Sequence, residues 1–236
     1  MSTHGFALVD GNHIHDTAVV GRNARLGTGN VIGPGAVLAG DLTIGDDNWF
    51  GAHVVIGCPP EMRGHPHTPD WIDEGDGLGV TIGSRTVLRE GAQVHGGLYE
   101  RTRVGDDVFL MNQVYIAHDC QLADGVTMAS TVAVGGHVHV GPRANLGLGT
   151  VVHQRRRIGG LAMVGMGSVV THDLPAFVKA YGNPCRVQGV NTVGMQRAQI
   201  SDEHVARVIA DVAAGEDSGW TSFPELAGFV LADGGE

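Results

Sequence analysis

Residues 104–140 read VGDDVFLMNQVYIAHDCQLADGVTMASTVAVGGHVHV, and their periodicity predicts the fold of the chain. Divided into sixes, it begins each unit with an aliphatic side chain or a methionine and often places glycine or alanine next. A period of six fits neither the 3.6-residue repeat of a helix nor the two-residue alternation of a strand. It is typical of short strands joined by tight corners, and three such units make one triangular coil.

The six-residue register covers most of the chain, from Leu8 to Val170, with two interruptions, and it amounts to about eight coils. Stacked at the ~4.8 Å spacing of paired strands, the coils would form a parallel solenoid in which each coil bonds only to its neighbours. Asparagines 18 residues apart predict an amide ladder inside one corner. They are Asn12, Asn30 and Asn48.

The two interruptions leave from the same edge of the predicted prism. The first inserts 20 residues, around Cys58–Val80, after the hexad that begins at Ile56, and the second inserts four residues after the hexad of Val94. Insertions that share one edge usually mark the binding side of a repeat protein. We therefore expect the functional site along this edge.

The chain divides into a repeat domain over residues 1–175, with a loop insertion at about 58–80, and a helical C-terminal segment over 176–236. Ser201, which is followed by two acidic residues, predicts the start of a helix, and Pro224 predicts a short final helix. The apolar face of the first helix would comprise Val205, Val208, Ile209 and Val212.

The overall composition narrows the class of protein and its compartment. Acidic residues outnumber basic ones by 25 to 15, and the net charge of −10 disfavours general nucleic-acid binding. Three widely spaced cysteines predict no disulfide framework and favour a reducing compartment. No apolar run approaches the ~18 residues that span a bilayer, and the amino terminus lacks a signal-peptide pattern. We therefore expect a cytoplasmic protein with no integral membrane segment.

Four of the 13 histidines fall beside the edge that carries the insertions, namely His95, His118, His137 and His153. Three interpretations stay open. The imidazoles could form a solvated polar stripe, or they could bind zinc, as in the gamma-class carbonic anhydrases that share this architecture. They could also supply a general base for acyl transfer, because a neutral imidazole can accept the proton of a hydroxyl that attacks a thioester.

Short motifs along and beyond this edge resemble those of a known family. They are Ile116-Ala117-His118-Asp119-Cys120, Gly136-His137-Val138, Val152-His153-Gln154 and Gly189-Val190-Asn191. They are similar to motifs of the UDP-N-acetylglucosamine O-acyltransferases that begin lipid A synthesis. The resemblance implies an all-β left-handed parallel β-helix with a small α-helical C-terminal appendage, assembled as a homotrimer. It also implies acyl carrier protein as partner, its phosphopantetheine thioester as co-substrate, and no separate cofactor or metal.

The resemblance also implies roles for individual residues. His118 would be the general base that deprotonates the sugar 3-hydroxyl, Asp119 would orient it, and the Gly136 amide would stabilise the oxyanion. Since consecutive residues of a flat strand face opposite ways, the pairing of His118 with Asp119 requires a corner. The expected substrate-binding residues are Glu61, Arg63, His95, His137, His153, Gln154, Met166, Asn191 and Arg197.

Members of this set have different expected contacts. Glu61 and Arg63 begin the loop that would grip the sugar nucleotide, and Asn191 and Arg197 would contact its nucleotide end. Met166 stands where the family measures acyl length, and a methionine there would block a groove that glycine leaves open. We therefore expect a (3-hydroxy)acyl group shorter than the family's usual long chains, although Met166 could equally be a core-packing residue.

Other activities remain open from the sequence alone. A hexapeptide-repeat enzyme could use acyl-CoA and acylate another amino sugar or small molecule, and an anhydrase-like metalloprotein or an inactive binding module would have the same repeats. Arg155-Arg156-Arg157 could meet a carrier protein or could be a solvated cluster. Arg156 falls at a normally inward place, so we expect a bulge or a carboxylate partner there.

Overall fold

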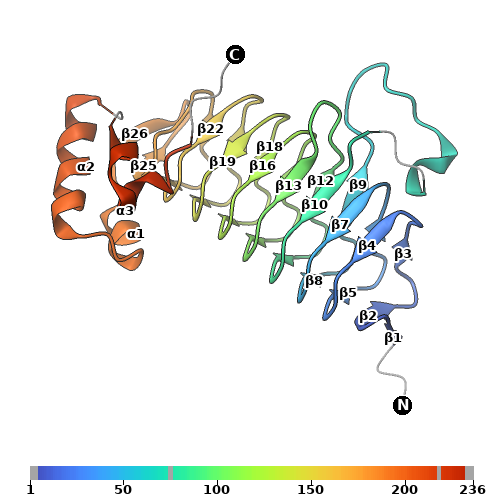
Figure 1. Cartoon of the computed structure of the whole chain (residues 1–236). Coiled ribbons are helices and arrows are strands. Elements are labelled where there is room, and N and C mark those ends of the chain that lie inside the picture. The colour runs from blue at the N-terminus through green and yellow to red at the C-terminus, as the bar shows by residue number, and fades with distance from the viewer. Residues whose placement is uncertain (1–4, 74–76, 217–218, 232–236) are drawn as a thin grey trace.

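The computed structural model describes residues 5–73, 77–216 and 219–231. Figure 1 shows a long three-sided stack of short strands, with helices at its C-terminal end and a long loop standing out beside β9. The described part of this long loop is residues 59–73 and 77–79, and it contains the 3₁₀-helix η1 (Pro69–Ile72). Each side of the stack is one sheet, and we name the three sheets A, B and C.

The strands of each sheet are given in their spatial order. Sheet A comprises β1 (Phe6–Val9), β2 (Asn12–His15), β5 (Val31–Ile32), β8 (Trp49–Phe50), β11 (Val87–Leu88), β14 (Phe109–Leu110), β17 (Thr127–Met128), β20 (Asn145–Leu146), β23 (Met163–Val164), β25 (Val178–Tyr181) and β26 (Arg186–Val190). Sheet B comprises β24 (Val169–Val170), β21 (Val151–Val152), β18 (Ala133–Val134), β15 (Tyr115–Ile116), β12 (Gln93–His95), β9 (Val55–Cys58), β6 (Val37–Leu38) and β3 (Val19–Val20). Sheet C comprises β22 (Arg157–Ile158), β19 (His139–Val140), β16 (Gln121–Leu122), β13 (Thr102–Val104), β10 (Val80–Ile82), β7 (Leu42–Ile44) and β4 (Ala24–Leu26).

The parallel solenoid predicted from the six-residue period is confirmed. In sheet A the first and last strands, β1 and β26, pair antiparallel, and the nine strands between them are parallel. The stack therefore has about nine turns, one more than the eight coils predicted from the six-residue register. Leu8, which opens the register in the sequence, lies in the antiparallel β1 and is exposed. At the other end β25 continues sheet A beyond residue 175, because Val178 and Ala180 still point inward.

Apart from Leu8, the first residue of each hexad points inward, and these residues form the core. Leu38, Leu88 and Ile116, for example, are fully buried. Burying a side chain of this size stabilises a fold by ~1.5–3 kcal/mol. The corners are turned by residues in the left-handed region, such as Asp107 with φ 56° and Asp119 with φ 61°, which short polar side chains tolerate better than β-branched ones.

One inner corner holds the predicted asparagine ladder. Asn30 Nδ2 donates to Asn12 Oδ1 at 2.9 Å, and Asn48 Nδ2 donates to Asn30 Oδ1 at 2.9 Å. All three side chains are buried. The Thr86 amide donates to Asn48 Oδ1 at 2.8 Å, so the next rung joins the ladder through its backbone.

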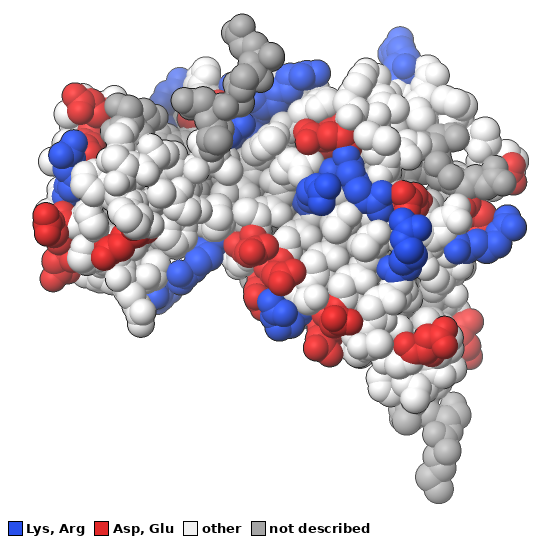
Figure 2. Space-filling view, in the orientation of Figure 1, with Lys and Arg blue, Asp and Glu red and all other residues white. Residues whose placement is uncertain are grey.

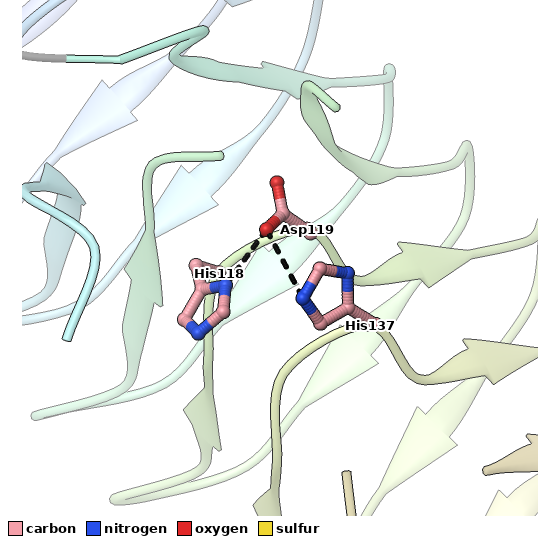
Figure 3. A group of neighbouring side chains, drawn as sticks. All are labelled: His118, Asp119 and His137. Atoms are coloured by element: carbon pink, nitrogen blue, oxygen red, sulfur yellow. Dashed lines mark hydrogen bonds and ion pairs between the residues drawn. The ribbon is translucent and has the colours of Figure 1, made fainter. Parts of the chain in front are cut away.

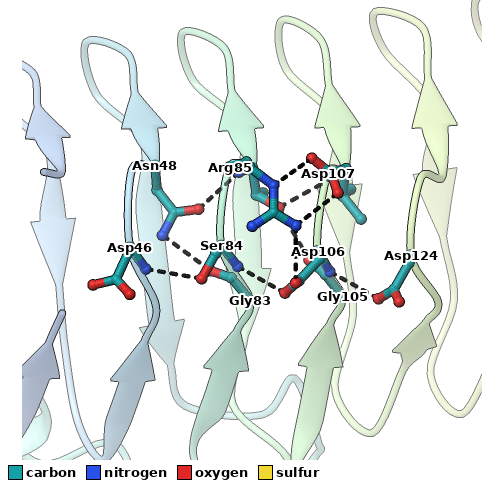
Figure 4. Close-up of polar contacts among 11 residues, drawn as sticks. Asp46, Asn48, Gly83, Ser84, Arg85, Gly105, Asp106, Asp107 and Asp124 are labelled. Atoms are coloured by element: carbon teal, nitrogen blue, oxygen red, sulfur yellow. Dashed lines mark hydrogen bonds and ion pairs between the residues drawn. The ribbon is translucent and has the colours of Figure 1, made fainter. Parts of the chain in front are cut away.

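On the outside of the same corner, carboxylates accept backbone amides from neighbouring rungs (Figure 4). Asp106 Oδ1 accepts from the Ser84 amide at 2.9 Å, and Asp124 Oδ1 accepts from the Asp106 amide at 2.9 Å. Arg85 pairs with both Asp106 and Asp107. An exposed corner carboxylate in this fold therefore serves to join rungs.

The C-terminal helices α1 (Thr192–Arg197), α2 (Asp202–Ala214) and α3 (Pro224–Ala227), with the 3₁₀-helix η2 (Trp220–Ser222), pack on the end of the stack. The helix starts predicted at Ser201 and Pro224 are confirmed. The predicted apolar face is wrong at Ile209, which is 45% exposed. Asp211 is buried instead, because Trp220 Nε1 donates to its carboxylate at 2.9 Å. Among the described residues, no helix is both long and apolar enough to cross a membrane.

Candidate active site

The edge between sheets B and C carries the four histidines singled out in the sequence. Strands β12, β15, β18 and β21 are neighbours in sheet B, and the chain turns toward sheet C after each of them. The histidine of each rung lies at or just beyond the end of its strand, so all four belong to one edge. The long loop leaves from this same edge, between β9 and β10.

His118 and Asp119 form a hydrogen-bonded pair at this edge (Figure 3). His118 Nδ1 lies 2.7 Å from Asp119 Oδ2, and the Asp119 carboxylate is 0% exposed. The corner that the pairing requires is present, since Asp119 has φ 61° and the left-handed turn brings both side chains to one side. The Thr102 hydroxyl accepts a hydrogen bond from the Asp119 amide at 2.9 Å and holds the turn in place.

Three backbone amides hold the other oxygen of this carboxylate. The amides of Leu98, Tyr99 and Glu100 donate to Asp119 Oδ1 at 2.7, 2.9 and 2.9 Å. Burial raises the pKa of Asp119, but the hydrogen bonds from these amides and from His118 outweigh it, and the pKa lies below its ordinary value. Asp119 is therefore an anion at neutral pH, and it favours the tautomer in which His118 Nδ1 carries the hydrogen.

His137 and Gly136 complete the surroundings of His118. The two imidazole rings are 5.1 Å apart, and His137 Nε2 lies 3.6 Å from Asp119 Oδ2 (Figure 3). Burial lowers the pKa of His137 despite the nearby carboxylate, so its imidazole is neutral at pH 7. A Cβ added to Gly136 would lie 2.8 Å from His118 Nε2, so this backbone borders the nitrogen that remains free. Within the described chain, the Gly136 N–H donates no hydrogen bond.

His95 joins the long loop to the site. Its Nδ1 lies 3.1 Å from the Pro59 carbonyl oxygen and its Nε2 lies 3.5 Å from Glu61 Oε1. The ring also lies 5.3 Å from that of Tyr115, one rung further along sheet B. Glu61 is thereby held at the edge that carries His118. Arg63 is exposed.

Other expected site residues lie apart from His118 within the single chain. His153 and Gln154 are exposed, and His153 Nδ1 lies 3.1 Å from the Gln154 carbonyl oxygen. Met166 follows β23 of sheet A, at a different corner, and it is 74% exposed. The side chain is therefore not a core-packing residue. Arg156 finds the expected carboxylate, with Nη1 3.2 Å from Asp173 Oδ1.

The residues expected at the nucleotide end belong to the C-terminal segment. Asn191 is the N-cap of α1: its Oδ1 accepts from the Gly194 amide at 3.1 Å and its Nδ2 donates to the Leu161 carbonyl at 2.8 Å. Its side chain is thus engaged in holding the helix start. Arg197 is exposed in the last turn of α1.

One group in the described residues could hold a metal ion, namely His118, Asp119 and His137, whose ligand atoms lie within 4.8 Å of one another. Two ligands of a tetrahedral zinc stand ~3.3 Å apart, whereas His118 Nδ1 and Asp119 Oδ2 are 2.7 Å apart. A metal would have to break this hydrogen bond. The geometry therefore fits a base oriented by a carboxylate better than a metal centre.

Sequence reasoning missed the residues that hold Asp119. Leu98, Tyr99 and Glu100 act through backbone amides, which no side-chain motif can reveal. The signal in the sequence is the four-residue insertion after the hexad of Val94, which predicts the binding edge but not these contacts. Cys120 follows Asp119 in the sequence. Burial raises the pKa of its thiol to about 12, so the thiol is not a nucleophile at neutral pH.

A three-sided solenoid with a carboxylate-oriented imidazole at one edge is the arrangement expected of a hexapeptide-repeat acyltransferase. A family profile described as UDP N-acetylglucosamine O-acyltransferase, domain 2, matches residues 173–211. An acyl-[acyl-carrier-protein]–UDP-N-acetylglucosamine O-acyltransferase of Pseudomonas putida is 35% identical over 211 residues, which cover 83% of this chain and 82% of the relative. That of Herminiimonas arsenicoxydans is 34% identical over 216 residues, which cover 83% of this chain and 79% of the relative.

Solved structures of UDP-N-acetylglucosamine acyltransferases also match the fold of this chain. A UDP-N-acetylglucosamine acyltransferase from Campylobacter jejuni matches with a TM-score of 0.74 and 27% identity, over 86% of this chain and 82% of that one. The Francisella novicida enzyme of the same name matches with a TM-score of 0.70 and 28% identity, over 84% of this chain and 78% of that one. The chain belongs to the UDP-N-acetylglucosamine O-acyltransferase family.

Proposed function

We propose that this protein moves an acyl group from the thioester of an acyl carrier protein to the 3-hydroxyl of UDP-N-acetylglucosamine or a related UDP-amino sugar. Two relatives carry the donor and the acceptor in their names and match about four fifths of their own length. The observation that carries the proposal is the His118–Asp119 pair, which leaves His118 Nε2 free beside an unused Gly136 N–H.

The geometry suits a single transfer in which His118 acts first as base and then as acid. The Nδ1–H group donates to Asp119, so Nε2 has the lone pair that takes the proton from the sugar hydroxyl. The hydroxyl oxygen attacks the thioester carbonyl, and the oxyanion that forms accepts a hydrogen bond from the Gly136 N–H. The C–S bond then breaks, and the leaving thiolate takes the proton from the imidazolium. Ester and thiol are the products, and His118 returns to its neutral form.

The acceptor would lie under the long loop. Glu61 is held over the edge by His95, so its carboxylate can accept hydrogen bonds from sugar hydroxyls. Neutral His137, 5.1 Å from His118, can donate to or accept from the same sugar without adding a charge. These contacts would place one hydroxyl at Nε2 and exclude water from it.

We also propose that the protein is a homotrimer whose protomers meet near this edge. The outward residues of sheet B are mostly apolar, namely Val19, Val37, Val55, Gln93, Tyr115, Ala133, Val151 and Val169. Those of sheet C are polar, namely Arg25, Thr43, Thr81, Arg103, Gln121, His139 and Arg157, and Figure 2 shows charged side chains over the β4–β13 part of the molecule. Burying the sheet B face would bring a second protomer beside His118 and could supply His153, Gln154, Asn191 and Arg197 to the site. A monomeric mass in light scattering would remove this part of the proposal.

For the acyl group we propose a chain shorter than the long 3-hydroxyacyl groups. Met166 is exposed at a corner of the stack, so in an assembly it can end a groove between protomers. Purified protein would be assayed with a series of acyl carrier protein thioesters of increasing length, alongside Met166→Gly. The variant should gain activity with longer chains, and an unchanged length preference would show that Met166 sets no limit.

The main activity is tested directly with acyl carrier protein thioesters and UDP-N-acetylglucosamine, by following thiol release and identifying the product by mass spectrometry. An ester at the 3-position supports the proposal. Transfer from acyl-CoA alone, or to other amino sugars alone, would instead support the CoA-dependent alternative.

A further inference from the structure

The segment Gly96–Glu100 belongs to the coil that carries the four-residue insertion. None of its side chains takes part in the proposed reaction, yet its backbone makes most of the contacts of the Asp119 carboxylate. Its last three amides converge on Asp119 Oδ1 at 2.7–2.9 Å and leave Oδ2 to His118. Successive N–H groups that point at one centre form a concave anion site in proteins. Here the anion is part of the chain itself.

Another corner carboxylate shows what the insertion adds. Asp124 lies at the next corner along the chain, and its Oδ1 accepts from one amide, that of Asp106. Asp119 Oδ1 accepts from three. A fully buried carboxylate without such partners would be costly, and it would take up a proton rather than remain charged. The extra residues therefore allow an anion to stay buried beside His118.

Backbone hydrogen bonds join the segment Gly96–Glu100 to both ends of the long loop. The Gly96 amide donates to the Cys58 carbonyl at 2.8 Å, and the Gly97 amide donates to the Gly79 carbonyl at 3.0 Å. The Leu78 amide donates back to the Gly97 carbonyl at 2.7 Å. Position 97 accepts only glycine, because a Cβ there would collide with the Glu100 carbonyl oxygen. The three amides are thus held before any substrate binds.

We propose that Gly96–Glu100 is a positioning element of the active site: its three amides hold the Asp119 carboxylate so that His118 Nε2 points at the acceptor hydroxyl. The inference rests on the proposed function and deepens it. It holds that this segment positions the base His118, and that it does not bind the sugar. The low pKa of Asp119 agrees with this geometry.

The test removes one N–H and leaves the rest of the site. Leu98→Pro deletes the amide that donates at 2.7 Å, and Leu98→Ala keeps this amide and reports the contribution of the side chain. Relative to Leu98→Ala, Leu98→Pro should lower kcat about tenfold or more, the effect of one charge-assisted hydrogen bond, with a smaller change in KM for the sugar nucleotide. In an Asp119→Ala background the two variants should differ by less than about twofold, because the amides then have no carboxylate to hold.

Equal kcat values for the two Leu98 variants, or a difference that persists without Asp119, would overturn the proposal. If Leu98→Pro does not fold, replacing the Leu98 amide by an ester removes the same N–H, and the same comparisons apply. A second measurement does not depend on the reaction: NMR titration of the Asp119 carboxyl should show a higher pKa in Leu98→Pro than in Leu98→Ala. An unchanged pKa would overturn the proposal, whereas a raised pKa in a protein that transfers no acyl group would refute only the proposed function.

Discussion

Replacing Asp119 by asparagine tests how the catalytic imidazole is oriented. Asparagine has the size of aspartate, and its carbonyl oxygen can still accept from the three amides. The amide nitrogen then faces His118 Nδ1 across the 2.7 Å contact and donates to it. The imidazole must then accept a hydrogen bond at Nδ1, so its hydrogen moves to Nε2. Nε2 therefore has no free lone pair with which to take the proton of the substrate.

The expected loss follows from what a general base contributes. Such a group accelerates a reaction by ~10²–10⁴-fold, which corresponds to ~2.7–5.4 kcal/mol of barrier. Thiol release from an acyl carrier protein thioester, measured at saturating UDP-N-acetylglucosamine, should therefore fall by ~10²–10⁴-fold in kcat. The KM for the sugar nucleotide should change little, because Asp119 is buried and does not reach the acceptor.

A matched control is available at the next corner. Asp124 is a corner carboxylate that accepts a hydrogen bond from one backbone amide and lies away from the four histidines. The kcat of Asp124→Asn should therefore stay near that of the native protein. If Asp119→Asn keeps a kcat within about threefold of the native value, or if Asp124→Asn loses as much, the orientation argument is wrong.

Three further predictions concern other parts of the molecule. Gly136→Ala should abolish most acyl transfer without loss of fold, because its methyl group would lie 2.8 Å from His118 Nε2. Native kcat in this variant would contradict the placement of Gly136 against His118 Nε2. Asn48→Ala should lower the free energy of unfolding by ~1–3 kcal/mol in urea titrations, since it leaves buried groups of the ladder unpaired. Asn145→Ala, at an exposed position of β20, should change the free energy of unfolding little. Equal losses in the two variants would refute the ladder's contribution. Asp211 has a lowered pKa because of its hydrogen bonds to Arg207 and Trp220, so the stability that it contributes is present above the ordinary carboxyl pKa and is lost as the pH falls through the lowered value. Fluorescence of Trp220 should report this acid transition, and Asp211→Asn should weaken the dependence; an identical pH profile in the variant would exclude Asp211 as the cause.

Most of the fold could be predicted because one residue in six carries the information. Ile116 and its equivalents must be buried, and the 18-residue spacing of Asn12, Asn30 and Asn48 sets the register independently. The ends were harder to predict, since Leu8 keeps the pattern while pairing antiparallel, and β25 keeps the stacking after the pattern has stopped. At the ends of a solenoid one neighbour is absent, so pairing is no longer set by the repeat.

The site could be predicted in part. Counting in sixes placed His118 and His137 on one edge, and their rings are 5.1 Å apart. The spacing of residues could not show whether Met166 packs in the core. The structure shows that it does not, because its side chain is exposed. The three amides around Asp119 could not be predicted, because backbone donors follow from the path of a loop and leave no residue type in the sequence.

In the proposed reaction His118 takes the proton from the acceptor hydroxyl. The most direct measurement compares single-turnover acyl transfer by the native protein, His118→Ala and His13→Ala, the last being an exposed histidine in β2 of sheet A. We expect His118→Ala to slow the chemical step by at least ~10²-fold while it still binds UDP-N-acetylglucosamine, and His13→Ala to react at the native rate. A chemical step in His118→Ala within a few-fold of the native rate would contradict this role of His118.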